Sequence, residues 1–235
     1  MNTDIVKIYD LRICCIGAGY VGGPTMAVIA DKCPKILVNI VDVDEKKINN
    51  WNDKDFKNLP VYEPGLESLL KKTRNKNLFF SNNVNEEISK ADVIFICVNT
   101  PTKKNGIGAG KASDLKWIEQ CARQISKNAK GHTIIVEKST VPVKTARVIE
   151  NILNAEMTNS NSSFSVLSNP EFLAEGSAID DLENPQRVLI GGEDKRALEL
   201  VSSIYRNWIN KNKIITTNLW SSELSKLTAN AFLAQ

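Results

Sequence analysis

The sequence predicts an α/β protein built on a doubly wound, mostly parallel sheet. Short apolar runs alternate with longer stretches of helical periodicity, and this alternation indicates parallel strands joined by right-handed crossovers. One run, 93–98, is apolar at every position, as expected for a strand that is buried on both faces. A glycine-rich turn at 17–22 directly follows the first predicted strand. Together these observations favour a Rossmann-type fold.

The predicted strands and helices follow one another through the chain. Apolar runs predict strands at residues 11–16, 36–42, 77–81, 93–98, 133–138, 164–168, 187–191 and 213–216. Helical periodicity lies between most of them, at residues 20–33, 64–75, 83–90, 113–129, 142–155 and 194–210. Two segments have the composition of loops: 100–113, which is rich in Gly and Lys, and 158–163, which is almost wholly polar.

A further helical pattern runs from about residue 219 to residue 235. Its apolar stripe includes Leu224, Leu227, Ala231 and Ala234, and it widens with Phe232 and Leu233. No Gly, Pro or basic last turn marks a stop. We therefore expect a dinucleotide-binding domain over residues 1–217 and, over 218–235, the start of a linking or dimerisation helix that continues into a second domain.

Composition excludes several classes of function. A chain of 235 residues can bury one sizeable core, and 42% apolar with 24% charged residues is typical of a globular domain. The net charge of +3 is too small to indicate nucleic acid or a membrane surface. The five cysteines are scattered without metal-ligand spacing, and His132 is the only histidine, so we expect no metal site and no Ser–His triad. A reduced, cytoplasmic compartment is the simplest inference.

One uncharged run requires an alternative to be weighed. Residues 13–30 lie between Arg12 and Asp31 without a charge, and their length is close to that of a membrane span. Glycines and a proline nevertheless cluster in the first two thirds of this run. Strand, tight turn and helix therefore explain it better than a membrane segment or a signal peptide.

The turn itself, Gly17-Ala18-Gly19-Tyr20-Val21-Gly22, has the pattern of a phosphate-binding loop. The first glycine permits the tight turn, the second lets the backbone approach a pyrophosphate, and the third allows close packing of helix on strand. Asp42 stands about 20 residues further on, where an acidic side chain binds the adenosine ribose and favours NAD over NADP. Lys47 either adds charge at the cofactor edge or is a solvated helix lysine.

Polar residues follow two of the predicted strands at the edge where parallel sheets bind ligands. The fourth strand ends in Val98-Asn99-Thr100-Pro101-Thr102, a segment whose polar residues suit a nicotinamide or ribose contact. The fifth ends in Glu137-Lys138-Ser139-Thr140-Val141-Pro142. Here Thr140 either positions a water or the nicotinamide amide, or Ser139 or Thr140 merely caps the helix that begins near Pro142.

The segment Asn169-Pro170-Glu171-Phe172-Leu173-Ala174-Glu175-Gly176 has two carboxylates flanking an apolar centre. In a helical turn both carboxylates would share one face, either in a cleft or on a capped surface turn. Lys226 lies in the last apolar helical pattern, with Asn230 one turn later on the same face. A lysine in this setting either snorkels outward or stabilises negative charge that develops on a substrate oxygen.

Several of these motifs together resemble the UDP-glucose 6-dehydrogenases in their animal-like form. The similar segments are Cys14–Thr25, Tyr62–Leu66, Val98–Thr102, Glu137–Pro142, Asn169–Gly176 and Ser221–Gln235. The resemblance spans nearly the whole chain, and its last two segments are the most specific. It implies oxidation of UDP-glucose to UDP-glucuronate with two NAD⁺, in a homo-oligomer, through a cysteine thiohemiacetal and thioester.

The resemblance also implies roles for individual residues. Glu171 would assist thioester hydrolysis as the acid/base, and Thr140 would hold the attacking water near the nicotinamide. Lys226 and Asn230 would bind the reacting end of the sugar and stabilise its oxyanion. The backbone of Phe172, Leu173 and Ala174 would contact the substrate, while Glu175 would face the cofactor. Ser139 would join the cofactor site with the residues after the fourth strand.

Two departures from the family pattern bear on activity. Lys47 replaces an arginine found in many relatives, so the bidentate fork is lost while the charge is kept. The family's nucleophilic cysteine lies beyond the last helix, and none of the five cysteines here stands in its motif. We therefore expect the isolated chain to bind NAD⁺ weakly and to form no UDP-glucuronate. A truncated, non-catalytic NAD-binding partner of full-length subunits and a dehydrogenase of another nucleotide sugar, such as a mannose derivative, remain alternatives.

Overall fold

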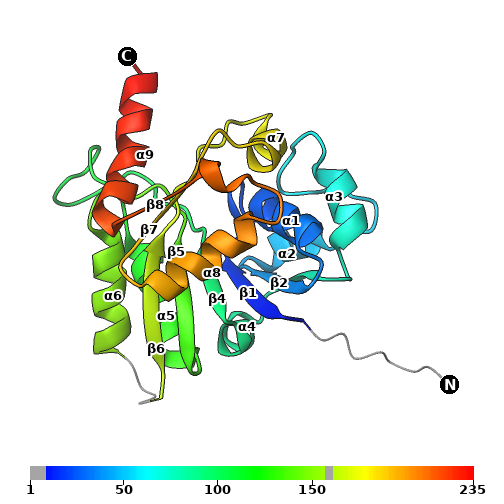
Figure 1. Ribbon diagram of the computed structural model, residues 1–235, viewed down its shortest axis with the longest axis horizontal. Helices are drawn as coiled ribbons and strands as arrows, with labels where there is room; N and C mark the ends of the chain where they lie inside the picture. The colour runs from blue at the N-terminus through cyan, green and yellow to red at the C-terminus, as the bar shows by residue number, and fades with distance from the viewer. Residues whose placement is uncertain (1–8, 157–160) are drawn as a thin grey trace.

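The computed structural model describes residues 9–156 and 161–235, in which an eight-stranded sheet carries helices on both faces (Figure 1). The strands lie in the order β3-β2-β1-β4-β5-β6-β7-β8, and neighbouring strands are parallel except for β6 and β7. The first six follow the strand order of the Rossmann fold, which reverses direction between β1 and β4. The predicted doubly wound, mostly parallel sheet is confirmed.

All eight predicted strands are present, with ends displaced by at most about two residues. The strands are β1 Leu11–Ile16, β2 Ile36–Val41, β3 Leu78–Ser81, β4 Val93–Ile96, β5 His132–Glu137, β6 Ser163–Ser168, β7 Val188–Gly192 and β8 Ile214–Thr217. The helices are α1 Gly22–Lys32, α2 Glu45–Trp51, α3 Leu66–Thr73, α4 Val84–Lys90, α5 Lys116–Asn128, α6 Thr145–Ala155, α7 Ala178–Glu183, α8 Lys195–Tyr205 and α9 Leu219–Leu233, with a short 3-10 helix at Lys211–Lys213.

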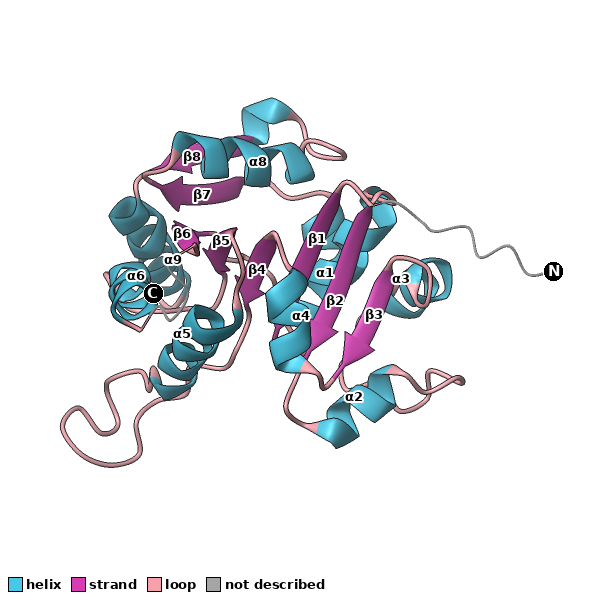
Figure 2. Cartoon of the chain, turned by 90° about the horizontal axis from the view of Figure 1, so that it is seen from below, coloured by secondary structure: helices cyan, strands magenta, loops and turns pink. Residues whose placement is uncertain are grey.

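Helices cover both faces of the sheet (Figure 2), which separates two hydrophobic cores. Helices α1, α2, α3, α7 and α8 supply the apolar side chains of one core, and α4, α5 and α6 those of the other. Successive strand residues point to opposite faces, so Cys15 belongs to the first core and its neighbour Cys14 to the second. Every residue of β4 is buried, as its uniformly apolar sequence predicts for a central parallel strand.

Four element assignments differ from the sequence prediction. Helices α2 and α7 lie in segments for which no helix was predicted, and α2 is started by Asp44, whose side chain accepts from the Lys47 N–H. The helix predicted over 194–210 ends at Tyr205 and continues as turns. In the loop predicted at 158–163, residues 158–160 lie outside the described residues, and Ser163 already belongs to β6.

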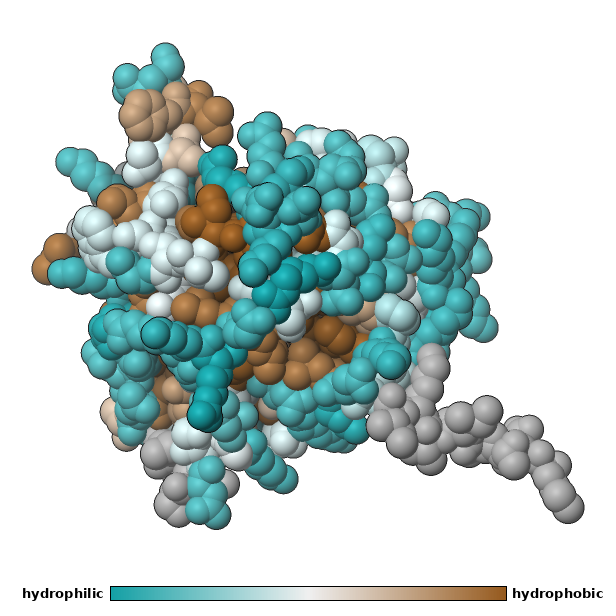
Figure 3. All heavy atoms as spheres, viewed as in Figure 1, coloured by the Kyte–Doolittle hydropathy of each residue, from teal (hydrophilic) through white to brown (hydrophobic). Residues whose placement is uncertain are grey.

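The last helix, α9, buries a different face from the expected one. Its buried residues are Leu219, Ser222, Glu223 and Lys226, which pack towards β6, β7 and α6. Leu224 and Leu227 are only partly buried, and the remaining stripe residues Ala231 and Ala234 are exposed. Phe232 and Leu233 are 77% and 87% exposed, so the projecting end of α9 presents apolar surface (Figure 3). The sheet is therefore contacted mainly by polar residues of this helix.

Candidate functional site

The glycines of the turn between β1 and α1 each meet a different geometric demand. Gly17 has a φ of 112°, and a Cβ there would lie 2.5 Å from the Cys97 carbonyl oxygen. A Cβ on Gly22 would lie 2.1 Å from the Gly17 carbonyl oxygen, so a side chain would push α1 away from the turn. Beside Gly19 a Cβ would meet no atom within 4 Å. That open space, at the start of a helix whose first N–H groups lack intrahelical partners, fits a phosphate.

Trp51 of α2 supports this turn, and sequence reasoning missed it. Its indole N–H donates to the Ala18 carbonyl at 3.0 Å, and the ring is fully buried and stacked on Phe80 at a centroid distance of 4.8 Å. A Cβ on Gly23 would lie 2.4 Å from that ring. The sequence signal for this contact was Gly23. The phosphate-binding pattern requires only Gly22, so a second glycine indicates that another group packs closely against the start of α1.

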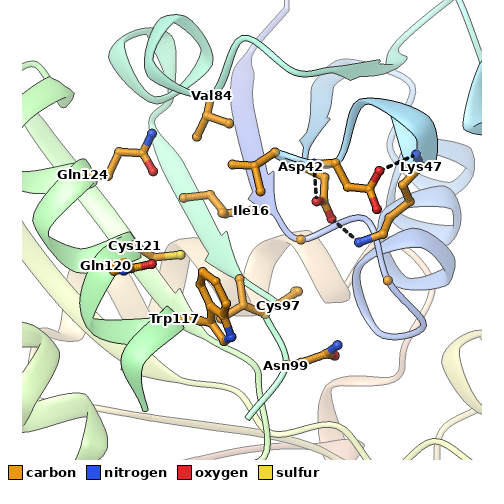
Figure 4. Close-up of a pocket in the computed structure, with 15 residues that line it drawn as sticks. Ile16, Asp42, Lys47, Val84, Cys97, Asn99, Trp117, Gln120, Cys121 and Gln124 are labelled. Atoms are coloured by element: carbon orange, nitrogen blue, oxygen red, sulfur yellow. Dashed lines mark hydrogen bonds and ion pairs between the residues drawn. The ribbon is translucent and has the colours of Figure 1, made fainter. Parts of the chain in front are cut away.

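Asp42 and Lys47 lie together at the end of β2 (Figure 4). Asp42 Oδ2 is 2.7 Å from Lys47 Nζ and accepts from the Ala18 N–H at 3.0 Å, while Oδ1 accepts from the Asp44 N–H. Burial alone would raise the pKa of Asp42, but these donors outweigh it and hold the pKa below its ordinary value. The site therefore presents an ionised carboxylate beside the glycine turn.

A cavity of about 390 Å³ opens next to this carboxylate. Its lining includes Gly17, Gly19, Asp42, Lys47, Val98 and Asn99, all of which were predicted cofactor residues. The structure adds side chains that the sequence did not reveal as site residues: Val84, Trp117, Gln120, Cys121 and Gln124 (Figure 4). These come from α4 and α5, which the sheet topology brings to the mouth between β1 and β4. Apolar walls with a few polar groups are typical of small-molecule sites.

The strand ends of β4 and β5 are cross-linked at the same edge of the sheet. Thr100 Oγ1 donates to the Thr140 carbonyl at 2.7 Å, and Ser139 Oγ donates to the Val98 carbonyl at 2.8 Å. Of the residues predicted after β4, Val98 and Asn99 line the first cavity, whereas Pro101 and Thr102 do not and are exposed. Thr102 instead pairs with Ser113 in the following loop.

The helix-capping alternative for Ser139 and Thr140 is wrong. Helix α6 begins at Thr145, and its N-cap is Lys144, with a φ of 78°. The acceptor for its first N–H groups is the carboxylate of Glu223 on α9, which sequence reasoning missed. The Thr140 hydroxyl is therefore left for another contact, and it points to Glu171.

Glu171, Lys226 and Thr140 meet in one cluster. Glu171 Oε1 lies 3.1 Å from Lys226 Nζ and accepts from Thr140 Oγ1 at 3.4 Å. The side chains of Lys226 and Glu171 are only 10% and 11% exposed. The alternative in which Lys226 snorkels into solvent is therefore wrong. A buried carboxylate, an ammonium and a hydroxyl converge on one point, as acid/base chemistry with oxyanion stabilisation requires.

The segment around Glu171 is irregular, so its two carboxylates do not share a helical face. Glu171 Oε2 accepts from the Leu173 N–H at 2.7 Å, which turns this carboxylate inward. Glu175 is exposed, and the carboxylate paired with Lys226 is that of Glu171. The prediction that the carboxylate lies in a cleft is therefore correct for Glu171. The prediction that both carboxylates share one helical face is wrong, because residues 169–174 form no helix.

This segment is joined to the glycine turn through Tyr20 and Glu63. The Tyr20 hydroxyl donates to the Ala174 carbonyl at 2.8 Å, and burial, with Glu63 nearby, raises its pKa. The buried Glu63 carboxylate accepts from the N–H groups of Gly176 and Ala178 at 2.8 and 3.0 Å. Burial alone would raise the pKa of Glu63, but these donors hold it low. The segment Tyr62–Leu66 is one of those that resemble the family, but sequence reasoning assigned its residues no role. The structure gives Glu63 a structural role, because its carboxylate holds the segment around Gly176 and Ala178.

A second cavity, of about 700 Å³, is lined in part by Glu171. Its lining includes the predicted substrate residues Glu171, Phe172, Leu173, Ala174, Lys226 and Asn230. Two cations lie over the Phe172 ring: the Arg187 guanidinium, 4.3 Å from its centroid, and the Lys226 ammonium, at 5.4 Å. Lys138 also reaches this cavity and contacts the Asn169 side-chain oxygen at 3.2 Å. The lining also includes the carboxylates of Asp180 and Asp181, so this cavity presents charged groups of both signs.

None of the five cysteines lines the cavity beside Glu171. All five are free and buried, and burial raises the pKa of Cys33 to about 11 and that of Cys121 to about 12. Burial also raises the pKa of Cys14 and Cys15. Within residues 9–156 and 161–235, His, Cys, Asp and Glu form no group of three that could hold a metal. Nor does any helix there have the length and apolarity needed to cross a membrane.

Comparison with known proteins agrees with this geometry. The NAD binding domain of the UDP-glucose/GDP-mannose dehydrogenase family matches residues 11–209. A UDP-glucose 6-dehydrogenase from Bos taurus is 57% identical over 228 residues, which cover 95% of this chain and 45% of the relative. UDP-glucose 6-dehydrogenase 3 from Oryza sativa subsp. japonica is also 57% identical, over 96% of this chain and 47% of its own length. The chain thus spans about half the length of these curated relatives.

Solved structures give the same picture of the fold. A UDP-glucose dehydrogenase from Pyrobaculum islandicum superposes with a TM-score of 0.84 at 29% identity, over 97% of this chain and 50% of that one. A GDP-mannose dehydrogenase from Pseudomonas aeruginosa superposes with a TM-score of 0.83 at 33% identity, over 95% and 50% of the two chains. The similarity therefore extends over almost every described element, α9 included.

Proposed function

The chain belongs to the UDP-glucose/GDP-mannose dehydrogenase family and carries its NAD-binding domain, and on this premise we propose that it serves the oxidation of UDP-glucose to UDP-glucuronate. In this reaction the sugar's primary alcohol becomes a carboxylate in two successive steps, and NAD⁺, when bound, accepts a hydride in each. Because the chain spans about half of its curated relatives, the activity is proposed for the whole protein.

One observation carries the proposal. The cluster of Glu171, Lys226 and Thr140 is tied to the phosphate-binding turn through the hydrogen bond from Tyr20 to Ala174. A cofactor held at the turn and a sugar held at the cluster would consequently share one mouth of the sheet. This proximity is what hydride transfer between two bound molecules requires, because the reacting atoms must approach within van der Waals distance.

The cofactor would be held mainly by backbone and by Asp42. The turn Gly17–Gly22 would bind the pyrophosphate, and Asp42 would accept from the adenosine ribose while Lys47 keeps that carboxylate ionised. Trp117 and Gln124 would flank the adenine end of the first cavity. The nicotinamide end would lie by Asn99, Thr100, Ser139 and Thr140, with Glu175 at its rim.

The reacting carbon would lie at the cluster. Glu171 would move the proton of the attacking water, which Thr140 would hold, and Lys226 with Asn230 would stabilise the negative charge on the sugar oxygen. The backbone of Phe172, Leu173 and Ala174 would position the sugar. We propose that the nucleophilic cysteine and most of the uridine pocket lie in a second domain, to which α9 leads, and that the whole protein is a homo-oligomer. The five free thiols support a reducing, cytoplasmic compartment.

The test separates cofactor binding from turnover. Titration calorimetry should detect NAD⁺ binding to the 235-residue chain. The Asp42→Asn variant should show a smaller difference than the wild type between the Kd for NADP⁺ and the Kd for NAD⁺. UDP-glucuronate formation should require the whole protein, and there Glu171→Gln should lower kcat about a hundredfold or more, as loss of a general acid/base does. Sustained UDP-glucuronate formation by the isolated chain would contradict the proposed division of the site.

Another nucleotide sugar is the main alternative substrate, because the GDP-mannose dehydrogenase superposes almost as well as the UDP-glucose enzyme. Comparing kcat/KM for UDP-glucose and GDP-mannose in the whole protein decides between them. A non-catalytic, NAD-binding partner is the second alternative. It predicts a native product of 26.1 kDa, which the mass of the protein in its own cells would reveal.

A further inference from the structure

Glu223 is a buried carboxylate that joins two elements of the site. It is 2% exposed, and it projects from α9 to the start of α6. One carboxylate oxygen accepts from the Lys144 N–H at 2.6 Å and the other from the Ala146 N–H at 2.7 Å. A carboxylate at a helix N-terminus is stabilised both by these hydrogen bonds and by the helix dipole.

Each of the two joined elements carries one contact to Glu171. Lys226 follows Glu223 by one turn of α9, and its ammonium lies 3.1 Å from Glu171. Thr140 lies in the connection from β5 to α6, just before Lys144, and its hydroxyl donates to Glu171 at 3.4 Å. The contacts therefore close a ring that runs from Glu223 through α9 and Lys226 to Glu171, and back through Thr140 to the start of α6.

The cap differs in kind from the other carboxylate caps of the described chain. Asp194 caps α8 from the position directly before it, accepting from the Arg196 and Ala197 N–H groups. Glu223 caps α6 from 77 residues away. A local cap stabilises only its own helix. A cap supplied by a second helix also fixes the position of the second helix relative to the first. Burial raises the pKa of Glu223, and the hydrogen bonds from the backbone at the start of α6 oppose that effect.

We propose that Glu223 is a positioning residue for the oxidation, holding Lys226 and the Thr140 connection at the separation at which both reach Glu171. The catalytic part of this inference rests on the proposed function. Its geometric content is independent: without the carboxylate, α9 and the start of α6 separate, and the ion pair between Lys226 and Glu171 loosens.

The geometric content is tested in the 235-residue chain. Glu223→Gln keeps the shape but places an amide N–H against a helix N–H, because each carboxylate oxygen of Glu223 accepts from a different N–H group. Asp194→Asn makes the same carboxylate-to-amide change at a cap remote from Glu171, where one oxygen accepts from both helix N–H groups and the amide nitrogen can face Ser165 Oγ. Acetylation of Lys226 at low reagent concentration, followed by mass spectrometry, should be several-fold faster in Glu223→Gln than in the wild type. It should be unchanged in Asp194→Asn, even where the two variants lose equal thermal stability. Equal Lys226 rates in all three proteins would overturn the inference.

The catalytic content is tested in the whole protein. Glu223→Gln should lower kcat for UDP-glucose oxidation by about tenfold to a hundredfold, the range expected when reacting groups are misplaced by about 1 Å, while the Kd for NAD⁺ stays unchanged. Combined with Thr140→Ala, it should lower kcat by less than the product of the two single effects, because both disturb one contact. A multiplicative effect, or a loss no larger than in Asp194→Asn, would overturn the catalytic role.

Two further outcomes are distinguishable. Should Glu223→Gln fail to fold, Glu223→Asp takes its place: the charge is kept but the reach is shortened, so Lys226 acetylation should again rise above the wild-type rate, and an unchanged rate would contradict the inference. Should the wild-type whole protein form no UDP-glucuronate, the proposed function fails. The acetylation comparison would then still support or overturn the positioning of Lys226 by Glu223.

Discussion

The glycine turn and the Glu171 cluster are assembled in opposite ways. The turn is contiguous in sequence, and its first and third glycines are required by atoms within a few ångströms, the Cys97 and Gly17 carbonyls. The cluster draws Thr140 from the end of β5, Glu171 from beyond β6 and Lys226 from α9. A local pattern specifies the first, whereas sheet topology specifies the second. The comparison teaches that side chains far apart in sequence become a site when strand ends gather at one edge.

The largest expected effect comes from filling the closest approach in the turn. Gly22→Ala places a Cβ 2.1 Å from the Gly17 carbonyl and 3.0 Å from Cys15 Sγ, and backbone cannot move aside as a flexible side chain can. We expect the free energy of unfolding, measured by urea denaturation, to fall by about 4 kcal/mol or more. A loss below that of a typical surface substitution would show that α1 is not packed as closely as the structure indicates.

The cluster should respond next, through its buried ion pair. Lys226→Met leaves the Glu171 carboxylate without its cationic partner, and breaking a buried pair in this way costs about 3 kcal/mol. Lys71→Met is the matched control, because it breaks an exposed pair with Glu67 on α3 that is worth at most about 0.5 kcal/mol. Urea denaturation of both variants checks the prediction. Equal losses would mean that the Lys226 pair is solvated rather than buried.

Glu137 should make the free energy of unfolding depend on pH. This residue ends β5, is buried, and has one oxygen, Oε1, without a hydrogen-bond partner among the described residues. Burial, with Glu223 nearby, raises its pKa well above the ordinary 4.5. The folded protein therefore holds a proton that the unfolded chain has released, so this group destabilises the fold as pH rises above 4.5 and until its folded pKa is passed.

Glu137→Gln should remove that dependence. Relative to the wild type, the variant should gain up to about 1.4 kcal/mol of unfolding free energy per pH unit above pH 4.5, and nothing below it. Urea denaturation from pH 4 to pH 8 measures this difference. A difference that stays constant over the range would show that Glu137 is ionised in the folded protein and has an unseen partner.

The smallest effect on stability should come from the middle glycine. Gly19→Ala meets no atom within 4 Å, so the unfolding free energy should change by no more than about 0.5 kcal/mol. The added methyl nevertheless occupies the space where the pyrophosphate would lie, and the Kd for NAD⁺ should rise about tenfold, or 1.4 kcal/mol. Calorimetry on the isolated chain measures it. Unchanged affinity would place the phosphates away from this turn.

The parts of the fold that were predicted correctly are those with strong local signals. The eight strands and the turn with Asp42 depend on apolar runs, glycines and one acidic residue, whose effects act over short stretches. The missed helices α2 and α7 are short and are stabilised by tertiary contacts, Trp51 on Ala18 and Glu63 on the Ala178 N–H. Residues 169–174 were not recognised as irregular for the same reason: their hydrogen-bond partners, Tyr20 and Asp181, lie elsewhere in the chain.

Sequence alone determined the α/β class, the glycine turn and the NAD-binding character of the domain, because glycine sterics and an acidic side chain express their chemistry locally. It also nominated Glu171, Thr140 and Lys226 as separate candidates. Only the tertiary structure decided that Lys226 turns inward to Glu171, that Thr140 joins them instead of capping α6, and that Glu223 supplies that cap. The physical reason is that burying a charge requires partners from several elements at once, and those partners meet only after the sheet has formed.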